Sequence, residues 1–264
     1  MHHRRVLSAV LLIPAFLLFI HASSPLAFHL LVSVAVALAG WEFARLCPVQ
    51  TGRGFGLLGA VAALLWQASL VRGSGAGLVT LALTGAALLR LLWTRAEFRS
   101  GAIQAAWLVL GAAYVGGFLG CAGLLRDQPA GRQLVYFLML TTWAADTGAY
   151  YVGSTVGRRP LAPALSPKKT VEGAVGGLLA TALTALIAGH WLLPALSWWA
   201  AVGLGLLLAA VGMAGDLCES GLKRAAGVKD SSGIIPGHGG ILDRLDSLMF
   251  AGPCLYALVR LGWL

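Results

Sequence analysis

The sequence predicts an all-α, polytopic integral membrane protein with about nine transmembrane helices and a cytoplasmic N-terminus. Of its 264 residues, 58% are hydrophobic and 11% are charged, and the mean hydropathy is +0.82. A soluble domain carries about 25% charged residues, so most of this surface must face lipid. Apolar residues also come in runs of roughly 20. The loops that connect these runs differ in how many Lys and Arg they carry.

Nine apolar runs are candidate membrane spans, because about 20 helical residues cross the hydrocarbon core. Helices are expected, since isolated strands would leave backbone groups unpaired in lipid. The basic segment Met1–Arg5 before the first run resembles the start of a signal peptide, but no clear cleavage site precedes a soluble domain, so we expect a retained helix. The runs cover about residues 6–22, 26–44, 55–71, 75–94, 103–125, 133–154, 173–193, 197–216 and 247–263.

The basic residues predict the orientation of these spans. With the N-terminus in the cytoplasm, 15 Lys and Arg fall on the cytoplasmic side and only Arg72, Arg126, Arg132 and Arg260 fall on the far side. Cytoplasmic loops of membrane proteins carry this excess, which predicts a multi-pass protein of the cell inner membrane with its C-terminus outside. The net charge of +9 is therefore mainly a topology signal, and we expect no nucleic-acid partner.

Two long polar loops, 154–172 and 216–246, are expected on the cytoplasmic side. We expect N-terminal transmembrane helices, residues 1–132, followed by a C-terminal transmembrane domain, residues 133–264, that carries both loops and is the candidate catalytic domain. The four Cys form no CxxC pair and indicate neither a zinc site nor a disulfide framework.

The acidic residues gather around these two loops. Seven of the ten are Asp146, Glu172, Asp216, Glu219, Asp230, Asp243 and Asp246, whereas Glu42, Glu97 and Asp127 are interpreted as solvated helix ends or loop residues. Charge is costly within a membrane and marks function. Asp146 lies inside an apolar run, where it needs a metal, water or a structural partner such as an Arg or a Tyr hydroxyl.

The first loop has the composition of a phosphate site. Glycines, hydroxyls and paired cations lie between Gly153 and Gly173, and Lys168 and Lys169 are candidate phosphate contacts. Thr170 or Glu172 is expected near the start of the next helix, whose dipole favours an anion. The alternative is a basic loop that only sets topology. The segment is not a Walker motif.

The second loop is flanked by two acid pairs. Asp216 with Glu219 and Asp243 with Asp246 have i,i+3 spacing, which places both members of a pair on one helix face. Such pairs offer hard oxygen ligands to a magnesium-like ion, and a metal with Lys and Arg neutralises a reacting phosphorus centre. His238 lies in a Gly-rich turn, where the alternatives are a hydrogen-bonding loop residue and a catalytic or nucleotide contact.

This second loop resembles the signature of the phosphatidate cytidylyltransferases, also called CDP-diacylglycerol synthases. The matching residues are Ser220, Lys223, Arg224, Lys229, Asp230, Ser232, Pro236, His238, Gly239, Gly240, Asp243, Arg244 and Asp246. Asp146, Tyr150, Gly153, Gly157, Ser166–Thr170, Glu172 and Gly173 look like an upstream pattern of the same family. The resemblance covers roughly residues 140–250.

The resemblance implies transfer of CMP from CTP to phosphatidate, giving CDP-diacylglycerol and pyrophosphate for phospholipid synthesis. It implies dependence on Mg²⁺, with a monovalent cation such as K⁺ able to share the site, and a homodimer in the lipid bilayer. By position, Asp216 and Asp243 match the family's metal-binding aspartates.

Residue roles follow from the resemblance and the charge pattern together. The expected catalytic residues are Asp216, Asp243, Asp246, Lys223, Arg224 and His238. The expected substrate-binding residues are Lys168, Lys169, Ser220, Lys229, Arg244, Gly239 and Gly240. The expected metal ligands are Asp216, Asp243, Asp246 and Asp146.

Other functions remain open at this point. A related CTP-dependent lipid enzyme, such as an isoprenoid-alcohol kinase or an ether-lipid cytidylyltransferase, differs only in its acceptor. An anion transporter would place polar residues along several spans near mid-membrane, whereas here they concentrate at one face. A non-catalytic scaffold would not need so complete a charged constellation.

Overall fold

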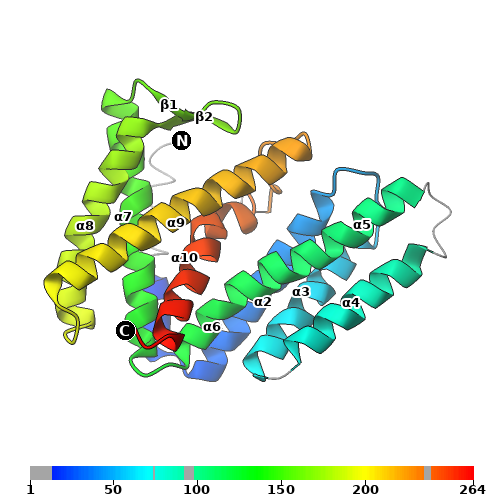
Figure 1. The fold of residues 1–264 in the computed structure, drawn as a ribbon, viewed down its shortest axis with the longest axis horizontal. Coiled ribbons are helices and arrows are strands. Elements are labelled where there is room, and N and C mark those ends of the chain that lie inside the picture. The colour runs from blue at the N-terminus through cyan, green and yellow to red at the C-terminus, as the bar shows by residue number, and fades with distance from the viewer. Residues whose placement is uncertain (1–13, 74, 92–97, 235–238) are drawn as a thin grey trace.

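The computed structural model describes residues 14–73, 75–91, 98–234 and 239–264, and these residues are mostly helical (Figure 1). Residues 14–22 are helical. The named elements are α2 (Pro25–Arg45), α3 (Phe55–Val71), α4 (Ala76–Leu91), α5 (Phe98–Gly111), η1 (Ala112–Leu119), α6 (Gly120–Arg126), α7 (Gly131–Val156), β1 (Pro160–Ala162), β2 (Ser166–Thr170), α8 (Val171–Leu192), α9 (Trp198–Ala225) and α10 (Leu242–Arg260).

Long apolar helices confirm the predicted class of an all-α membrane protein. Within the described ranges, four helices are long and apolar enough to cross a membrane: Pro25–Arg45, Phe98–Arg126, Val171–Leu192 and Trp198–Ala225. The second of these runs without a break through α5, the π-helical η1 and α6. The number nine, the orientation and the division at residue 133 stay predictions.

The two polar loops are shorter than the sequence predicts. α9 continues to Ala225 and α10 begins at Leu242, so the expected loop 216–246 was wrong at both ends. A span estimated from apolar residues stops at the first charges, whereas helical hydrogen bonding continues through them. In the expected loop 154–172, α7 continues to Val156 and an antiparallel β1–β2 hairpin follows.

Local side chains fix the turn between α7 and α8. Thr170 is the N-cap of α8 and accepts a hydrogen bond from the Gly173 N–H at 3.1 Å. The Glu172 carboxylate accepts the backbone N–H groups of Arg158 at 3.0 Å and Arg159 at 3.1 Å. These N–H groups therefore bind Glu172 in this structure, not a phosphate.

α7 and α8 pack unusually closely because glycines face the contact. A Cβ added at Gly176 would lie 2.4 Å from Val152, and one added at Gly177 would lie 2.7 Å from the carbonyl oxygen of Ala145. Small residues at helix contacts are typical of membrane proteins, where association depends on close van der Waals packing.

An aromatic cluster joins the N-terminal helices to α10. Phe43 of α2 stacks on Trp107 of α5 with ring centroids 4.9 Å apart, and the Trp107 Nε1 donates to the Phe43 carbonyl at 2.8 Å. Tyr114 and Phe118 of η1 lie edge-on to Phe250 of α10, at 6.0 and 5.3 Å. α10 is thereby held against the N-terminal half.

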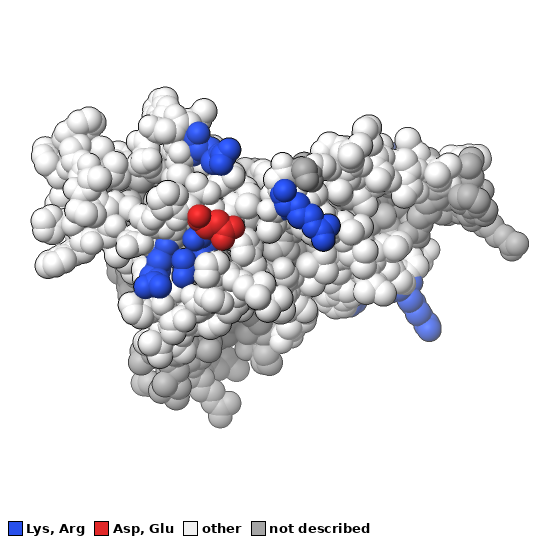
Figure 2. Space-filling view, turned by 90° about the horizontal axis from the view of Figure 1, so that it is seen from below, with Lys and Arg blue, Asp and Glu red and all other residues white. Residues whose placement is uncertain are grey.

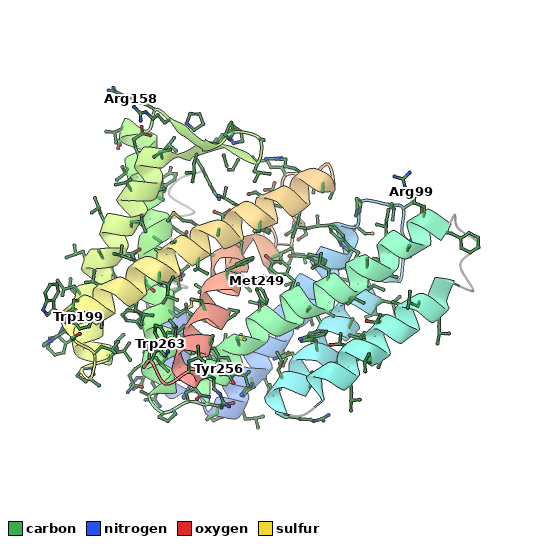
Figure 3. The ribbon with its side chains drawn as sticks, viewed as in Figure 1. Arg99, Arg158, Trp199, Met249, Tyr256 and Trp263 are labelled. Carbon is green, nitrogen blue, oxygen red and sulfur yellow. The ribbon has the colours of Figure 1, made fainter. Side chains whose placement is uncertain are left out.

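Four labelled side chains mark two opposite ends of the molecule. Arg99 and Arg158 lie at one end, and Trp199 and Trp263 lie at the other (Figure 3). The latter end, viewed in Figure 2, carries few charged groups on an otherwise uncharged surface. Leu26, Leu78 and Leu179 are among the large apolar side chains exposed on the helix surfaces.

Candidate functional site

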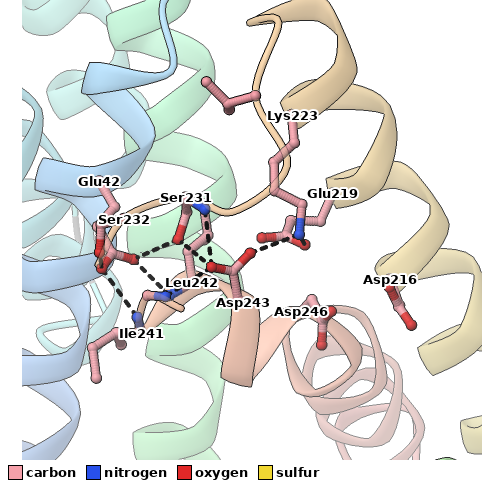
Figure 4. A network of polar contacts seen from close by, with 12 residues as sticks. Glu42, Asp216, Glu219, Lys223, Ser231, Ser232, Ile241, Leu242, Asp243 and Asp246 are labelled. Atoms are coloured by element: carbon pink, nitrogen blue, oxygen red, sulfur yellow. Dashed lines mark hydrogen bonds and ion pairs between the residues drawn. The ribbon is translucent and has the colours of Figure 1, made fainter. Parts of the chain in front are cut away.

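Three carboxylates converge where α9 and α10 pack together. Asp216 and Glu219 of α9 and Asp246 of α10 each offer an oxygen, and these oxygens all lie within 4.8 Å of one another. Figure 4 shows the three side chains beside the first turns of α10. Gly215 permits this approach, since a Cβ there would lie 2.8 Å from the Asp246 carbonyl oxygen. We call these residues the acid cluster.

Two lysines pair with the acid cluster. Lys169, at the end of β2, forms an ion pair with Asp216. The Lys223 Nζ lies 2.6 Å from Glu219 Oε2 and 2.6 Å from Asp243 Oδ1. Its side chain is 12% exposed and Glu219 is fully buried, so this pairing is shielded from water. The hairpin and α9 therefore both supply cations to the same place.

Asp243 is held by donors from the protein on both of its oxygens. Oδ1 accepts Lys223, and Oδ2 accepts the Ser231 N–H at 2.9 Å, the Ser231 hydroxyl at 2.8 Å and the Gly240 N–H at 2.8 Å. Burial raises the pKa of this carboxyl, but the bonds from Lys223, Gly240 and Ser231 outweigh it and hold the pKa below its usual value. Asp243 therefore accepts as a carboxylate and orients Lys223.

Asp146 approaches the cluster from α7. It lies within electrostatic reach of Asp216, Lys169 and Arg244 and hydrogen-bonds to Ser247. Its side chain is exposed, as is that of Arg244 on the first turn of α10. α7, β2, α9 and α10 thus all contribute charged groups to one region.

Some predicted residues lie elsewhere. Arg224 points away from the acid cluster: its guanidinium donates to the carbonyl oxygens of Leu165 and Val228, both at 3.2 Å. It therefore ties the hairpin and the segment after α9 together. Lys168 is exposed and precedes Lys169 on the strand, so the two side chains point to opposite faces.

The remaining predicted residues surround α9 and the start of α10. Ser220 is half-buried on α9, and Lys229 is exposed beyond its end. Gly239 has a φ of +79°, a conformation that glycine adopts without strain. His238 and Pro236 lie outside the described residues.

Two functional candidates escaped the residue assignments made from sequence. Glu219 received no individual role, although its spacing from Asp216 was a usable signal. Glu42 was interpreted as a solvated helix end, and this was wrong: it is fully buried and bonded to Ser231, Ser232, Ile241 and Leu242. These partners lie 189 to 200 residues away, so no local pattern identifies them.

The residues present fit a divalent cation. Mg²⁺ prefers hard carboxylate oxygens, and the acid cluster supplies three within one ion's reach. Carboxylates this close repel one another unless cations or protons compensate them. Glu219 Oε1 is buried and has no hydrogen-bond partner among the described residues, which leaves it free to act as a ligand.

Comparison with known proteins gives one consistent result. A sequence profile described as the cytidylyltransferase family matches residues 3–262. The chain is 42% identical over 157 residues to a phosphatidate cytidylyltransferase of Staphylococcus saprophyticus. It is 41% identical over 157 residues to proteins of the same name in Staphylococcus aureus strain COL and Staphylococcus epidermidis strain RP62A. Each alignment covers 60% of this chain and 60% of the relative.

Proposed function

The chain belongs to the cytidylyltransferase family, and from this we propose that it is a phosphatidate cytidylyltransferase. It transfers CMP from CTP to phosphatidate, releasing pyrophosphate and forming CDP-diacylglycerol for phospholipid synthesis. The names of the Staphylococcus relatives support this acceptor, over the 60% of their length that the alignments cover.

One observation carries the proposal: an acid cluster and two lysines meet at the junction of α9, α10 and the hairpin. Asp216, Glu219 and Asp246 lie within 4.8 Å of one another, and Lys169 and Lys223 pair with them. Joining two anionic phosphates is mainly an electrostatic problem, and a mixed cluster of this kind is suited to it.

In the proposed reaction, a phosphatidate phosphate oxygen attacks the α-phosphorus of CTP. A new P–O bond forms as the bond to the bridging oxygen breaks, and pyrophosphate leaves with that electron pair. Since the nucleophile is already an anion, no strong general base is needed. In this proposal Lys169, Lys223 and Arg244, which lie around the acid cluster, bind phosphate oxygens and hold the two substrates in line.

Asp216, Glu219 and Asp246 would hold Mg²⁺, with Asp146 beside them. The bound ion supplies Lewis-acid stabilisation of the phosphate charge. Asp243 stays a candidate ligand by family position, and K⁺ a candidate second ion. Lys168, Lys229 and the Gly239–Gly240 turn stay candidates for substrate contact.

The membrane setting follows from the same proposal. The end of the molecule that carries Arg158 (Figure 3), near the hairpin whose Lys169 pairs with Asp216, faces the cytoplasm, where CTP is present, in a multi-pass protein of the cell inner membrane. The phosphatidate head group reaches the cluster from the adjacent leaflet while its acyl chains stay in lipid. We expect a homodimer.

The direct test is turnover by the purified protein in detergent or lipid vesicles. With CTP, phosphatidate and Mg²⁺, wild-type protein should release pyrophosphate and form a liponucleotide identified by mass spectrometry; a chelator should abolish both. Asp246→Asn should lower kcat by roughly 100-fold or more, because it removes charge from the acid cluster.

Arg72→Ala is the matched control, because Arg72 follows α3, outside the elements that carry the acid cluster. It should keep wild-type turnover. A phosphorylated isoprenoid alcohol as product would replace the proposal with the kinase alternative. Wild-type activity in Asp246→Asn would remove the acid cluster from the mechanism.

A further inference from the structure

Glu42 is a buried acid from the N-terminal half placed at the candidate site. It lies near the end of α2, with 0% of its surface exposed. Figure 4 shows its carboxylate on the opposite side of Asp243 from Lys223 and Glu219. The proposed reaction assigns it no role, and a buried carboxylate at this position needs a physical reason.

Four donors surround the Glu42 carboxylate, and one of them, the Ser231 hydroxyl, shares its single proton with Asp243. Oε1 accepts the Ser232 hydroxyl at 2.6 Å and the Ile241 N–H at 3.0 Å. Oε2 accepts the Ser231 hydroxyl at 3.1 Å and the Leu242 N–H at 2.7 Å. All four donors belong to residues 231–234 and 239–242, which we call the α10 entry segment.

The donor set calls for a carboxylate and not its amide. Each oxygen receives one peptide N–H, and a peptide N–H cannot reverse its direction. A glutamine would present an NH₂ group to one of these N–H groups in either orientation. In addition, Ile241 and Leu242 lie at the start of α10, where the helix dipole favours negative charge. Glu42 thus caps α10 from another helix.

Glu42 reaches Asp243 through a shared donor. The Ser231 hydroxyl lies 3.1 Å from Glu42 Oε2 and 2.8 Å from Asp243 Oδ2. The Ser231 and Gly240 N–H groups also bind Asp243, so the same segment that Glu42 holds supplies three of the donors to Asp243. Asp243 in turn accepts Lys223, which pairs with Glu219 of the acid cluster.

The contact is too tight to be incidental. A Cβ added at Gly240 would lie 2.1 Å from the Ser231 hydroxyl and 2.5 and 2.6 Å from the two Glu42 oxygens. Glu42 therefore occupies the space that any other residue at position 240 would fill.

We infer that Glu42 is a positioning residue for the reaction: it fixes the α10 entry segment and, through it, the carboxylate of Asp243 and the ammonium group of Lys223. This inference rests on the proposed function. Removing a residue that orients such groups, without contacting the substrate, typically lowers activity or metal affinity by roughly 10- to 100-fold.

The test compares Glu42→Gln, Ser232→Ala and a control, Gln104→Leu, in the full-length protein. Gln104 is also buried in the N-terminal half but donates to the Gln50 carbonyl, away from the entry segment. For each variant, kcat, KM for CTP, the Mg²⁺ concentration for half-maximal rate, the melting temperature and hydrogen exchange over residues 239–246 are measured.

Glu42→Gln should lower kcat by roughly 10- to 100-fold and speed exchange over residues 239–246. Ser232→Ala, which removes one of the four donors, should show a smaller loss in the same direction. Gln104→Leu should lower the melting temperature but keep kcat and exchange over 239–246 near wild type. A positioning role predicts that kcat falls in the Glu42 and Ser232 variants but not in Gln104→Leu. General destabilisation would predict that kcat falls together with the melting temperature in all three.

Wild-type kcat and exchange in Glu42→Gln would overturn the inference, as would equal kcat losses in Glu42→Gln and Gln104→Leu at equal melting temperature. Should Glu42→Gln fail to fold, Ser232→Ala decides: unchanged kcat and exchange would contradict the role. An inactive wild-type protein would instead contradict the proposed function, and exchange over 239–246 would still report whether Glu42 fixes the segment.

Discussion

At the residue scale, the site depends on which side chains have room to approach one another. Gly240 is the clearest case, because its missing Cβ admits both Glu42 and Ser231. Its backbone does not have a positive φ, so an alanine there meets a steric problem and not a conformational one. Among the residues that the structure describes, none has an atom within 4 Å of a Cβ added at Gly233, in the same entry segment.

Gly240→Ala should therefore destabilise the protein by about 1–3 kcal/mol and lower kcat, because the new methyl group forces Glu42 and Ser231 apart. Thermal unfolding in detergent and the pyrophosphate-release assay measure the two effects. Gly233→Ala is the matched control and should change neither. If both variants show the same melting temperature and the same kcat, the close packing at Gly240 does not contribute to stability or activity.

Residue-scale prediction from sequence succeeded where the signal was local. The i,i+3 spacing placed Asp216 and Glu219 on one face of α9, and the structure brings their oxygens together with that of Asp246. It failed for Glu42, whose donors are 189 to 200 residues distant. The sequence also could not show that Arg224 binds the Leu165 carbonyl. A sequence motif does not say which way a basic side chain points, because that depends on how its helix packs in the fold.

At the scale of elements, the helices follow from apolar runs but their ends do not. Each of α2, α3, α8 and α9 overlaps an expected run, while α9 extends nine residues beyond the expected end at 216, to Ala225. That extension carries Glu219 and Lys223 of the candidate site on regular helix. The β1–β2 hairpin was missed, since strands of three and five residues are too short to give a periodic signal.

The contact between α7 and α8 sets the position of Asp146 on α7 relative to Lys169 on β2, two residues before the start of α8. Gly177→Leu should separate the two helices, because even a Cβ would lie 2.7 Å from the Ala145 carbonyl oxygen. We expect a loss of stability of about 1–3 kcal/mol or more, with reduced turnover. Thermal unfolding and the turnover assay measure both.

Gly203→Leu on α9 provides the comparison for this helix contact. Gly203 is exposed, and an added Cβ there meets no atom within 4 Å in the described part of the chain, so a leucine should be tolerated. A Gly177→Leu variant as stable and active as Gly203→Leu would show that the helices separate without cost.

At the scale of the whole molecule, four exposed side chains mark two opposite ends. Arg158 and Arg99 lie at one end, Trp199 and Trp263 at the other (Figure 3). The proposed orientation predicts that the first end faces the cytoplasm. In a variant whose four native cysteines are replaced, Arg158→Cys should react with a membrane-impermeant maleimide only in inside-out vesicles, and Trp199→Cys only in intact cells or spheroplasts.

Reversal of that labelling pattern would invert the topology and place the acid cluster away from CTP. Labelling of both positions from the same side would instead contradict an odd number of spans between them. The sequence predicts the orientation through its bias of 15 to 4 in basic residues. It does not predict how the helices are arranged around one another, because that arrangement depends on which glycine-lined helix faces pack together.

The separation of Glu42 from its partners also has a consequence for biosynthesis. α2 leaves the ribosome and enters the bilayer long before Ile241 and Leu242 are translated. During that time the Glu42 carboxylate lacks the N–H donors that surround it in the folded protein. Closure of this long-range contact is among the last events of assembly. The Glu42 contact therefore stays incomplete until α10 has been inserted.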